Sequence, residues 1–76
     1  MKEKVFEIVA QVMNVPIESV NEDSSPDTIK EWDSLKHMNL ILTLEEDFCV
    51  QFNDEEIVEM LNVSLIIDIL THKLAV

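Results

Sequence analysis

The chain has 76 residues, which predicts one domain spanning residues 1–76 with a single hydrophobic core. Hydrophobic residues make up 47% of it, which excludes a disordered tail, and the absence of glycine disfavours the tight turns of β-hairpins. The formal net charge of -11 argues against binding to nucleic acid or to anionic membrane surfaces and favours partners with basic patches. With one cysteine and no membrane-span or signal-peptide pattern, we expect a cytoplasmic protein, monomeric by default and stabilised by helix packing.

The chain begins with one helical pattern that is followed by a long loop. Apolar residues recur at helical spacing from Lys2 to Asn14, which predicts a first helix there. Pro16 disfavours helical backbone at the preceding residue and closes this element. Residues 21–33 form a polar loop, for which Ile29 and Trp32 are the expected anchors. A loop of this length in so small a domain is often functional.

Three further helices are expected. The second runs from Ser34 to Phe48. A short third helix starts near Asn53, because N-D-E-E matches a capping box, and the last helix begins near Asn62 or Ser64. The predicted fold is therefore all-α, a four-helix bundle with three longer helices and one short helix.

The second predicted helix carries two apolar stripes, whereas a surface helix needs only one. The first stripe consists of four apolar residues with one histidine among them: Leu40, Ile41, Leu44, Phe48 and His37. The second stripe consists of Leu35, Met38 and Leu42. Periodicity alone favours burial of both stripes in a central helix. The alternative is that the second stripe is exposed, because an apolar strip flanked by Glu45 and Glu46 suits a transient docking surface.

Ser34 follows Asp33 at the start of the second helix, and two interpretations of it are open. In the first, Asp33 or Ser34 caps free backbone N–H groups, which is the common role of such residues. In the second, Ser34 carries a phosphodiester, which the N–H groups and partial positive charge of a helix N-terminus would stabilise. Asp33 would repel that phosphate, but it fits a contact with the modifying enzyme through a metal ion. Ser-His-Asp catalysis with His37 is excluded, because no glycine is present for a nucleophile elbow or an oxyanion loop.

Three motifs taken together resemble those of the acyl carrier proteins. They are D-S-L at residues 33–35, I-L-T-L-E-E-D-F at residues 41–48 and N-D-E-E at residues 53–56. Length, acidity, helix layout and the long first loop agree, so the resemblance covers essentially the whole chain. It implies that Ser34 receives a 4′-phosphopantetheine arm from coenzyme A, installed by a Mg²⁺-dependent phosphopantetheinyl transferase. The arm's thiol would hold acyl groups as thioesters, and the carrier would be no enzyme itself but would shuttle its cargo between enzymes.

The resemblance also implies roles for residues around Ser34. Asp33 and Leu35 complete the attachment motif. The residues expected to dock on acyl-loading and acyl-processing enzymes with basic patches are Leu35, Met38, Leu42, Glu45 and Glu46. The residues expected to part and shelter an acyl chain are His37, Leu44, Met60 and Ile66. One stripe of the second helix would then serve the core and the cargo, and the other would serve partners.

Three positions depart from the carriers of fatty-acid synthesis. Lys36 stands where an acidic or small residue is usual, Asn39 replaces a docking glutamate, and F-N at residues 52–53 replaces Ile-Pro. These changes weaken the negative charge of the recognition surface near Ser34. They argue against the general carrier of fatty-acid synthesis, and E-W-D-S-L at residues 31–35 with His37 nearby resembles a discrete carrier from a specialised lipid, surface-polysaccharide or natural-product pathway. The alternative is an unmodified acidic interaction module, in which Ser34 is only a cap and the second stripe binds a partner helix.

Cys49 and His72 receive ordinary structural interpretations. We expect Cys49 to be a small buried hydrophobic residue and not a reactive thiol. His72 is expected to face water near the end of the last helix. No metal site is expected, because the acidic runs lack the glycine that a calcium-binding loop of the EF-hand type requires.

Overall fold

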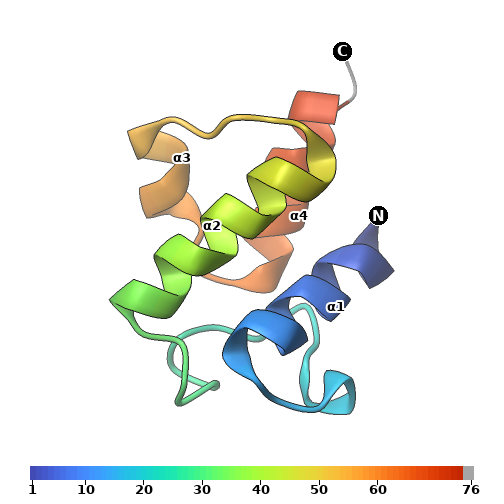
Figure 1. Cartoon of the computed structure of the whole chain (residues 1–76), viewed down its shortest axis with the longest axis vertical. Coiled ribbons are helices and arrows are strands. Elements are labelled where there is room, and N and C mark those ends of the chain that lie inside the picture. Colours follow the sequence, from blue (N-terminus) through green and yellow to red (C-terminus); the bar gives the residue numbers. More distant parts are fainter. Residues whose placement is uncertain (75–76) are drawn as a thin grey trace.

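The structure, a computed structural model, describes residues 1–74 as four α-helices and one short 3-10 helix (Figure 1). The α-helices span Lys2–Met13 (α1), Ser34–Phe48 (α2), Asp54–Glu59 (α3) and Val63–Leu74 (α4), and the 3-10 helix η1 spans Ile17–Ser19. Residues 1–74 contain no β-strand. The predicted all-α fold with three longer helices and one short helix is confirmed, and the predicted bounds of the second helix match those of α2.

The hydrophobic core lies among α1, α2 and α4. α1 packs against both α2 and α4, and Figure 1 shows α3 on the side of α2 away from α1. Buried apolar residues recur every three or four positions along the long helices, as expected for helices that each turn one face inward. The buried apolar side chains are Val5, Ile8, Val9, Ala10, Met13, Val20, Ile29, Trp32, Leu40, Ile41, Leu44, Phe52, Met60, Val63, Ile66 and Leu70.

The long loop before α2 is fixed to the start of α4. The backbone N–H groups of the first two residues of α4 donate to the carbonyl oxygens of Ser24 and Glu22, both at 2.9 Å. A helix leaves such N–H groups without intrahelical partners, so the loop satisfies them. Ile29 and Trp32 are buried, which confirms them as the anchors of the loop. The loop therefore delivers Trp32 to the start of α2 in a defined position.

Within residues 1–74, two helices end in left-handed backbone although the chain contains no glycine. Asn14, after α1, has φ 59°, and Cys49, after α2, has φ 54°. Asparagine tolerates this region, whereas a cysteine Cβ is crowded there. Cys49 is exposed, so the expected burial of this residue is wrong. The physical reason is its place at the C-cap of α2, outside the core, where the backbone conformation matters more than side-chain packing.

Replacing Cys49 with glycine is expected to raise the free energy of unfolding by about 0.5–1 kcal/mol. Glycine removes the crowding of the left-handed conformation, and the greater freedom of the unfolded chain offsets part of that gain. Urea unfolding of Cys49→Gly and of Cys49→Ala, which keeps the Cβ atom, measures the effect. An equal gain in both variants would show that backbone strain at residue 49 is not the cause.

Candidate functional site

Asp33, and not Ser34, caps the start of α2. The Asp33 Oδ1 atom accepts a hydrogen bond from the backbone N–H of Lys36 at 2.9 Å, which makes Asp33 the N-cap residue. Ser34 is the first residue of the helix, and its side chain is exposed. Of the two candidate caps, the structure selects Asp33, so capping does not occupy the Ser34 hydroxyl.

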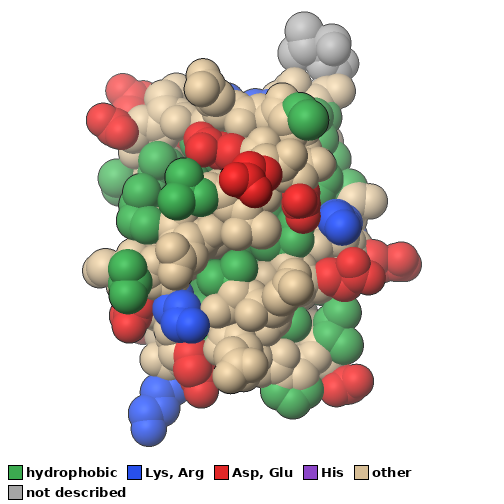
Figure 2. Space-filling model, viewed as in Figure 1, with side chains coloured by type: hydrophobic (Ala, Val, Ile, Leu, Met, Phe, Trp, Pro, Cys, Tyr) green, Lys and Arg blue, Asp and Glu red, His purple; other side chains and the backbone are tan. Residues whose placement is uncertain are grey.

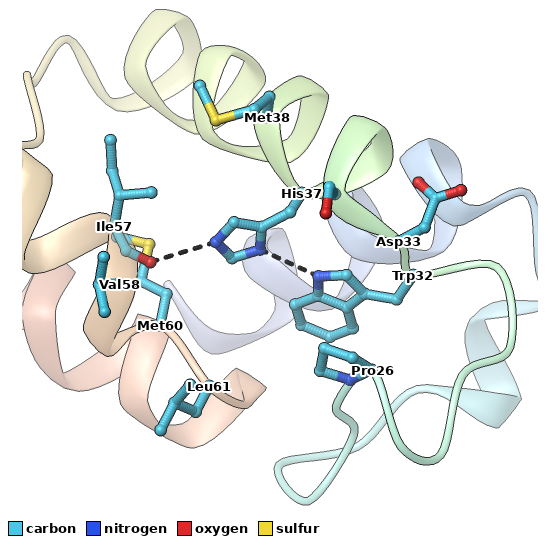
Figure 3. A pocket seen from close by; sticks show the side chains of 10 residues that line it. Pro26, Trp32, Asp33, His37, Met38, Ile57, Val58, Met60 and Leu61 are labelled. Carbon is cyan, nitrogen blue, oxygen red and sulfur yellow. Dashed lines mark hydrogen bonds between the residues drawn. The ribbon is translucent and has the colours of Figure 1, made fainter.

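An apolar cavity of about 470 Å³ lies beside Ser34 (Figure 3). It is bounded by the loop before α2, by the first turns of α2 and by α3 with the residues that follow it. Its volume falls within the range of roughly 300–1,000 Å³ that is typical of small-ligand pockets. The exposed serine therefore opens onto a space that accepts apolar groups.

The four residues predicted to wall a cargo site divide into two pairs. His37 and Met60 line the cavity beside Ser34. Leu44 and Ile66 are completely buried in the core and do not line it. The structure thus brings only the first pair together with Ser34.

The cavity has five further apolar lining residues, which were not predicted as walls from the sequence: Pro26, Trp32, Ile57, Val58 and Leu61. Trp32 was predicted to pack the loop onto the bundle, which was favoured over stacking on a ligand. The sequence signal for the other wall was the set of apolar residues 57, 58 and 61 close after the capping box, of which the first two lie in α3 and the third follows it.

His37 is hydrogen-bonded at both ring nitrogens (Figure 3). The indole N–H of Trp32 donates to His37 Nδ1 at 3.0 Å, and His37 Nε2 lies 3.2 Å from the carbonyl oxygen of Ile57. An indole N–H can only donate and a carbonyl oxygen can only accept. These two partners therefore require a neutral imidazole with its proton on Nε2. The ring joins the loop, α2 and α3 at the edge of the cavity.

The second stripe of α2, named the α2 strip below, is exposed. Leu35 is 71% exposed, Leu42 is 55% exposed and Met38 is 46% exposed. Burial of both stripes, which periodicity alone favoured, is therefore wrong for this stripe. Val58 and Leu61, in and just after α3, are exposed as well and share the cavity rim with Met38.

Two charged residues near the α2 strip make structural contacts. Glu45 is half-buried, and its Oε2 atom accepts the backbone N–H of Phe52 at 2.9 Å, whereas Glu46 is exposed. Lys36 donates from Nζ to the carbonyl oxygen of Val12 at 3.1 Å, near the C-terminus of α1. A cation is favoured at that end of a helix. The lysine that departs from the carrier pattern therefore directs its charge to α1 and away from the α2 strip.

The start of α3 is held by a capping box and an ion pair. Asn53 and Glu56 exchange side-chain to backbone hydrogen bonds at 2.8 and 2.9 Å, which confirms the predicted box. Lys73 Nζ lies 2.9 Å from the Glu56 carboxylate and joins α3 to α4. The backbone N–H of Asn53 and the Lys73 ammonium lower the pKa of Glu56. The resulting stabilisation is present at neutral pH and is lost as the pH falls through that lowered pKa.

The face that shows α2 in front carries many acidic and few basic side chains (Figure 2). On the left of this view, hydrophobic side chains gather over α3 and the adjoining part of α2, with acidic side chains around them. Among residues 1–74, no helix combines the length and hydropathy needed to cross a membrane. Within the same residues, no three His, Cys, Asp or Glu side chains are grouped so as to hold a metal ion.

Fold and site together define a small acidic helical bundle with an exposed serine, an apolar cavity beside it and an apolar strip. No protein-family model matches the chain. The chain is 37% identical over 73 residues to the acyl carrier protein of Thermosynechococcus vestitus, covering 96% of this chain and 90% of that protein. It is 26% identical over 73 residues to the acyl carrier protein of Buchnera aphidicola subsp. Schizaphis graminum, covering 96% and 92%. The chain belongs to the acyl carrier protein family.

Proposed function

We propose that residues 1–76 form one carrier domain, which holds acyl groups as thioesters on a 4′-phosphopantetheine arm attached to Ser34. The chain would be no enzyme itself and would pass its cargo between the enzymes of a biosynthetic pathway. One observation carries the proposal: the Ser34 side chain is exposed, is not used as the helix cap and opens onto an apolar cavity. Membership of the carrier family supports it.

The start of α2 suits an attached phosphodiester. The free N–H groups of the first turn and the positive end of a helix of 15 residues stabilise negative charge there. The first turn contains no acidic residue, and the Asp33 carboxylate is engaged by the N–H of Lys36. When attached, the arm would supply the thiol that forms thioesters. The cavity beside Ser34 offers apolar surface that would shield a hydrophobic cargo from water.

The attachment residue is tested by intact-mass measurement after incubation with coenzyme A, Mg²⁺ and a broad-specificity phosphopantetheinyl transferase. We expect the unaltered chain to gain the mass of one arm and Ser34→Ala to gain none. Ser19→Ala, at another exposed serine, is the matched control and should still be modified. Because Asp33 supplies the cap, Ser34→Ala should change the free energy of unfolding by less than about 0.5 kcal/mol. If a transferase that modifies another carrier leaves this chain unmodified, the proposal fails, and an unmodified interaction module becomes the better assignment.

A change of Asp33 to asparagine separates capping from arm installation. Asparagine caps a helix about as well as aspartate, so stability should change by no more than about 0.5 kcal/mol. We expect the rate of arm installation to fall by about tenfold or more, because an amide is a poorer ligand than a carboxylate for the Mg²⁺ of the transferase. Asp33→Ala is the contrasting variant, which loses the cap and about 1 kcal/mol of stability. An unchanged installation rate in Asp33→Asn would show that the Asp33 carboxylate caps α2 and takes no part in arm installation.

We further propose that the α2 strip, with Glu45 and Glu46, docks on the transferase and on acyl-loading and acyl-processing enzymes with basic patches. The strip begins at Leu35, directly beside Ser34, so a partner bound there would lie next to the attachment point. The departures at Asn39 and at residues 52–53 support a specialised lipid, polysaccharide or natural-product pathway. Efficient use of the modified chain by the enzymes of general fatty-acid synthesis would contradict the specialised assignment.

A further inference from the structure

α3 is the least firmly held wall of the cavity beside Ser34. It has six residues, and none of them is buried. A helix this short has little stability of its own. Its start is held by the Glu56–Lys73 ion pair, and the buried Met60 follows its end. At its end, the carbonyl oxygen of Ile57 accepts the backbone N–H of Met60 at a long 3.4 Å, and His37 Nε2 lies 3.2 Å from the same oxygen.

The opposite wall of the cavity is fixed. Trp32 is only 3% exposed, and the loop that carries it is hydrogen-bonded to the start of α4. His37 lies between this fixed wall and the end of α3, one helical turn after Ser34 (Figure 3). Nδ1 of His37 faces a donor and Nε2 faces an acceptor. The tautomer with its proton on Nε2 therefore makes both hydrogen bonds at once. The imidazole is thus a bridge across the cavity edge.

We propose that His37 is a positioning residue that fixes the width of this cavity and thereby selects cargo by length. The cavity accepts a short acyl chain without rearrangement. Leu44 and Ile66 are fully buried and do not line the cavity, so a chain too long for the cavity reaches the core only if α3 moves away from α2 and the bond to Ile57 breaks. The selection of cargo rests on the proposed carrier function, whereas the bridge is a property of the unmodified chain.

The bridge is tested first in the unmodified chain by ¹⁵N NMR and amide hydrogen exchange. We expect the neutral ring of His37 to carry its proton on Nε2; a neutral ring with its proton on Nδ1 would overturn the proposal. Trp32→Phe removes the indole donor and keeps an aromatic ring, and His37→Leu removes both bonds. In both variants, the backbone amide hydrogens of Ile57 and Met60 should exchange roughly three- to tenfold faster. This is the factor expected when the net free energy of one hydrogen bond is lost. His72→Leu is the matched control, since the hydrogen bond of the His72 ring goes to the carbonyl oxygen of Asp68 in its own helix and does not bridge to α3. Unchanged exchange in the two bridge variants would also overturn the proposal.

The selection of cargo is tested in the modified chain with butyryl and hexadecanoyl thioesters on the arm. The measured quantity is the ratio of the hexadecanoyl to the butyryl hydrolysis rate in water. We expect Trp32→Phe and His37→Leu to lower this ratio by roughly threefold or more, because a released α3 lets the longer chain enter and be shielded. His72→Leu should leave the ratio unchanged. An unaltered ratio in both bridge variants contradicts the selection of cargo by His37. Failure to install any arm contradicts the proposed function instead. The hydrogen-exchange measurement on the unmodified chain then still tests the bridge.

Discussion

Leu44→Ala is expected to lower the free energy of unfolding by about 2–5 kcal/mol. Leu44 is completely buried in the core that α2 shares with its neighbours, so the truncation loses apolar burial and leaves a cavity. At roughly 0.05–0.15 kcal/mol per residue, a chain of this length has a total stability on the order of 4–11 kcal/mol. The variant should therefore lose a large share of its stability and unfold at a much lower urea concentration.

Leu42→Ala is the matched control, two residues earlier on the same helix. It removes the same atoms from a side chain that is 55% exposed, so the loss should stay below about 1 kcal/mol. Urea unfolding of both variants in parallel measures the difference between the two stripes of α2. Equal losses would mean that the assignment of one stripe to the core and the other to the surface is wrong.

The second large effect is expected on docking. Leu42→Asp places a charge on the α2 strip, between Met38 and Glu45, and we expect it to raise the KM of the transferase for this chain by about tenfold or more. The reason is that an apolar contact of the proposed docking surface is replaced by a carboxylate that must lose water to bind. Because Leu42 is exposed, stability should change little, and kcat should be retained if the chemistry at Ser34 is undisturbed.

Ile17→Asp provides the comparison for the docking experiment. Ile17 lies in η1, is 43% exposed and does not belong to the α2 strip, so the same change of charge is made elsewhere on the surface. Its KM should match that of the unaltered chain. A similar rise in both variants would assign the effect to net charge and remove the α2 strip from the docking surface.

The helices were predictable because their signals are local. Ser34 to Phe48 is bounded by an acidic cap and a change of periodicity, and the box at Asn53 fixes the start of α3. The burial of each stripe of α2 was not predictable from periodicity, because it depends on which neighbours cover the helix. α1 covers one side, whereas α3 is too short to cover the strip that begins at Leu35.

The residues of the candidate site were predictable from the sequence, whereas most of its geometry was not. Ser34 and Asp33 were recognisable from the motif, but only the backbone geometry shows which of them caps the helix. The two bonds of His37 depend on where the loop places Trp32 and where α3 ends, and both are set by contacts distant in sequence. Cys49 was misjudged because residue type predicts burial on average, whereas a helix end imposes its own backbone conformation.

Trp32 is the only tryptophan of the chain, and it forms one wall of the cavity beside Ser34. Under the proposed function, an acyl chain that enters the cavity would pack against the indole, which is only 3% exposed to water. The fluorescence emission of the native chain would then change on loading, because the neighbours of the indole change. Under the proposed function, this tryptophan would therefore report cargo entry and release in real time, without an added dye.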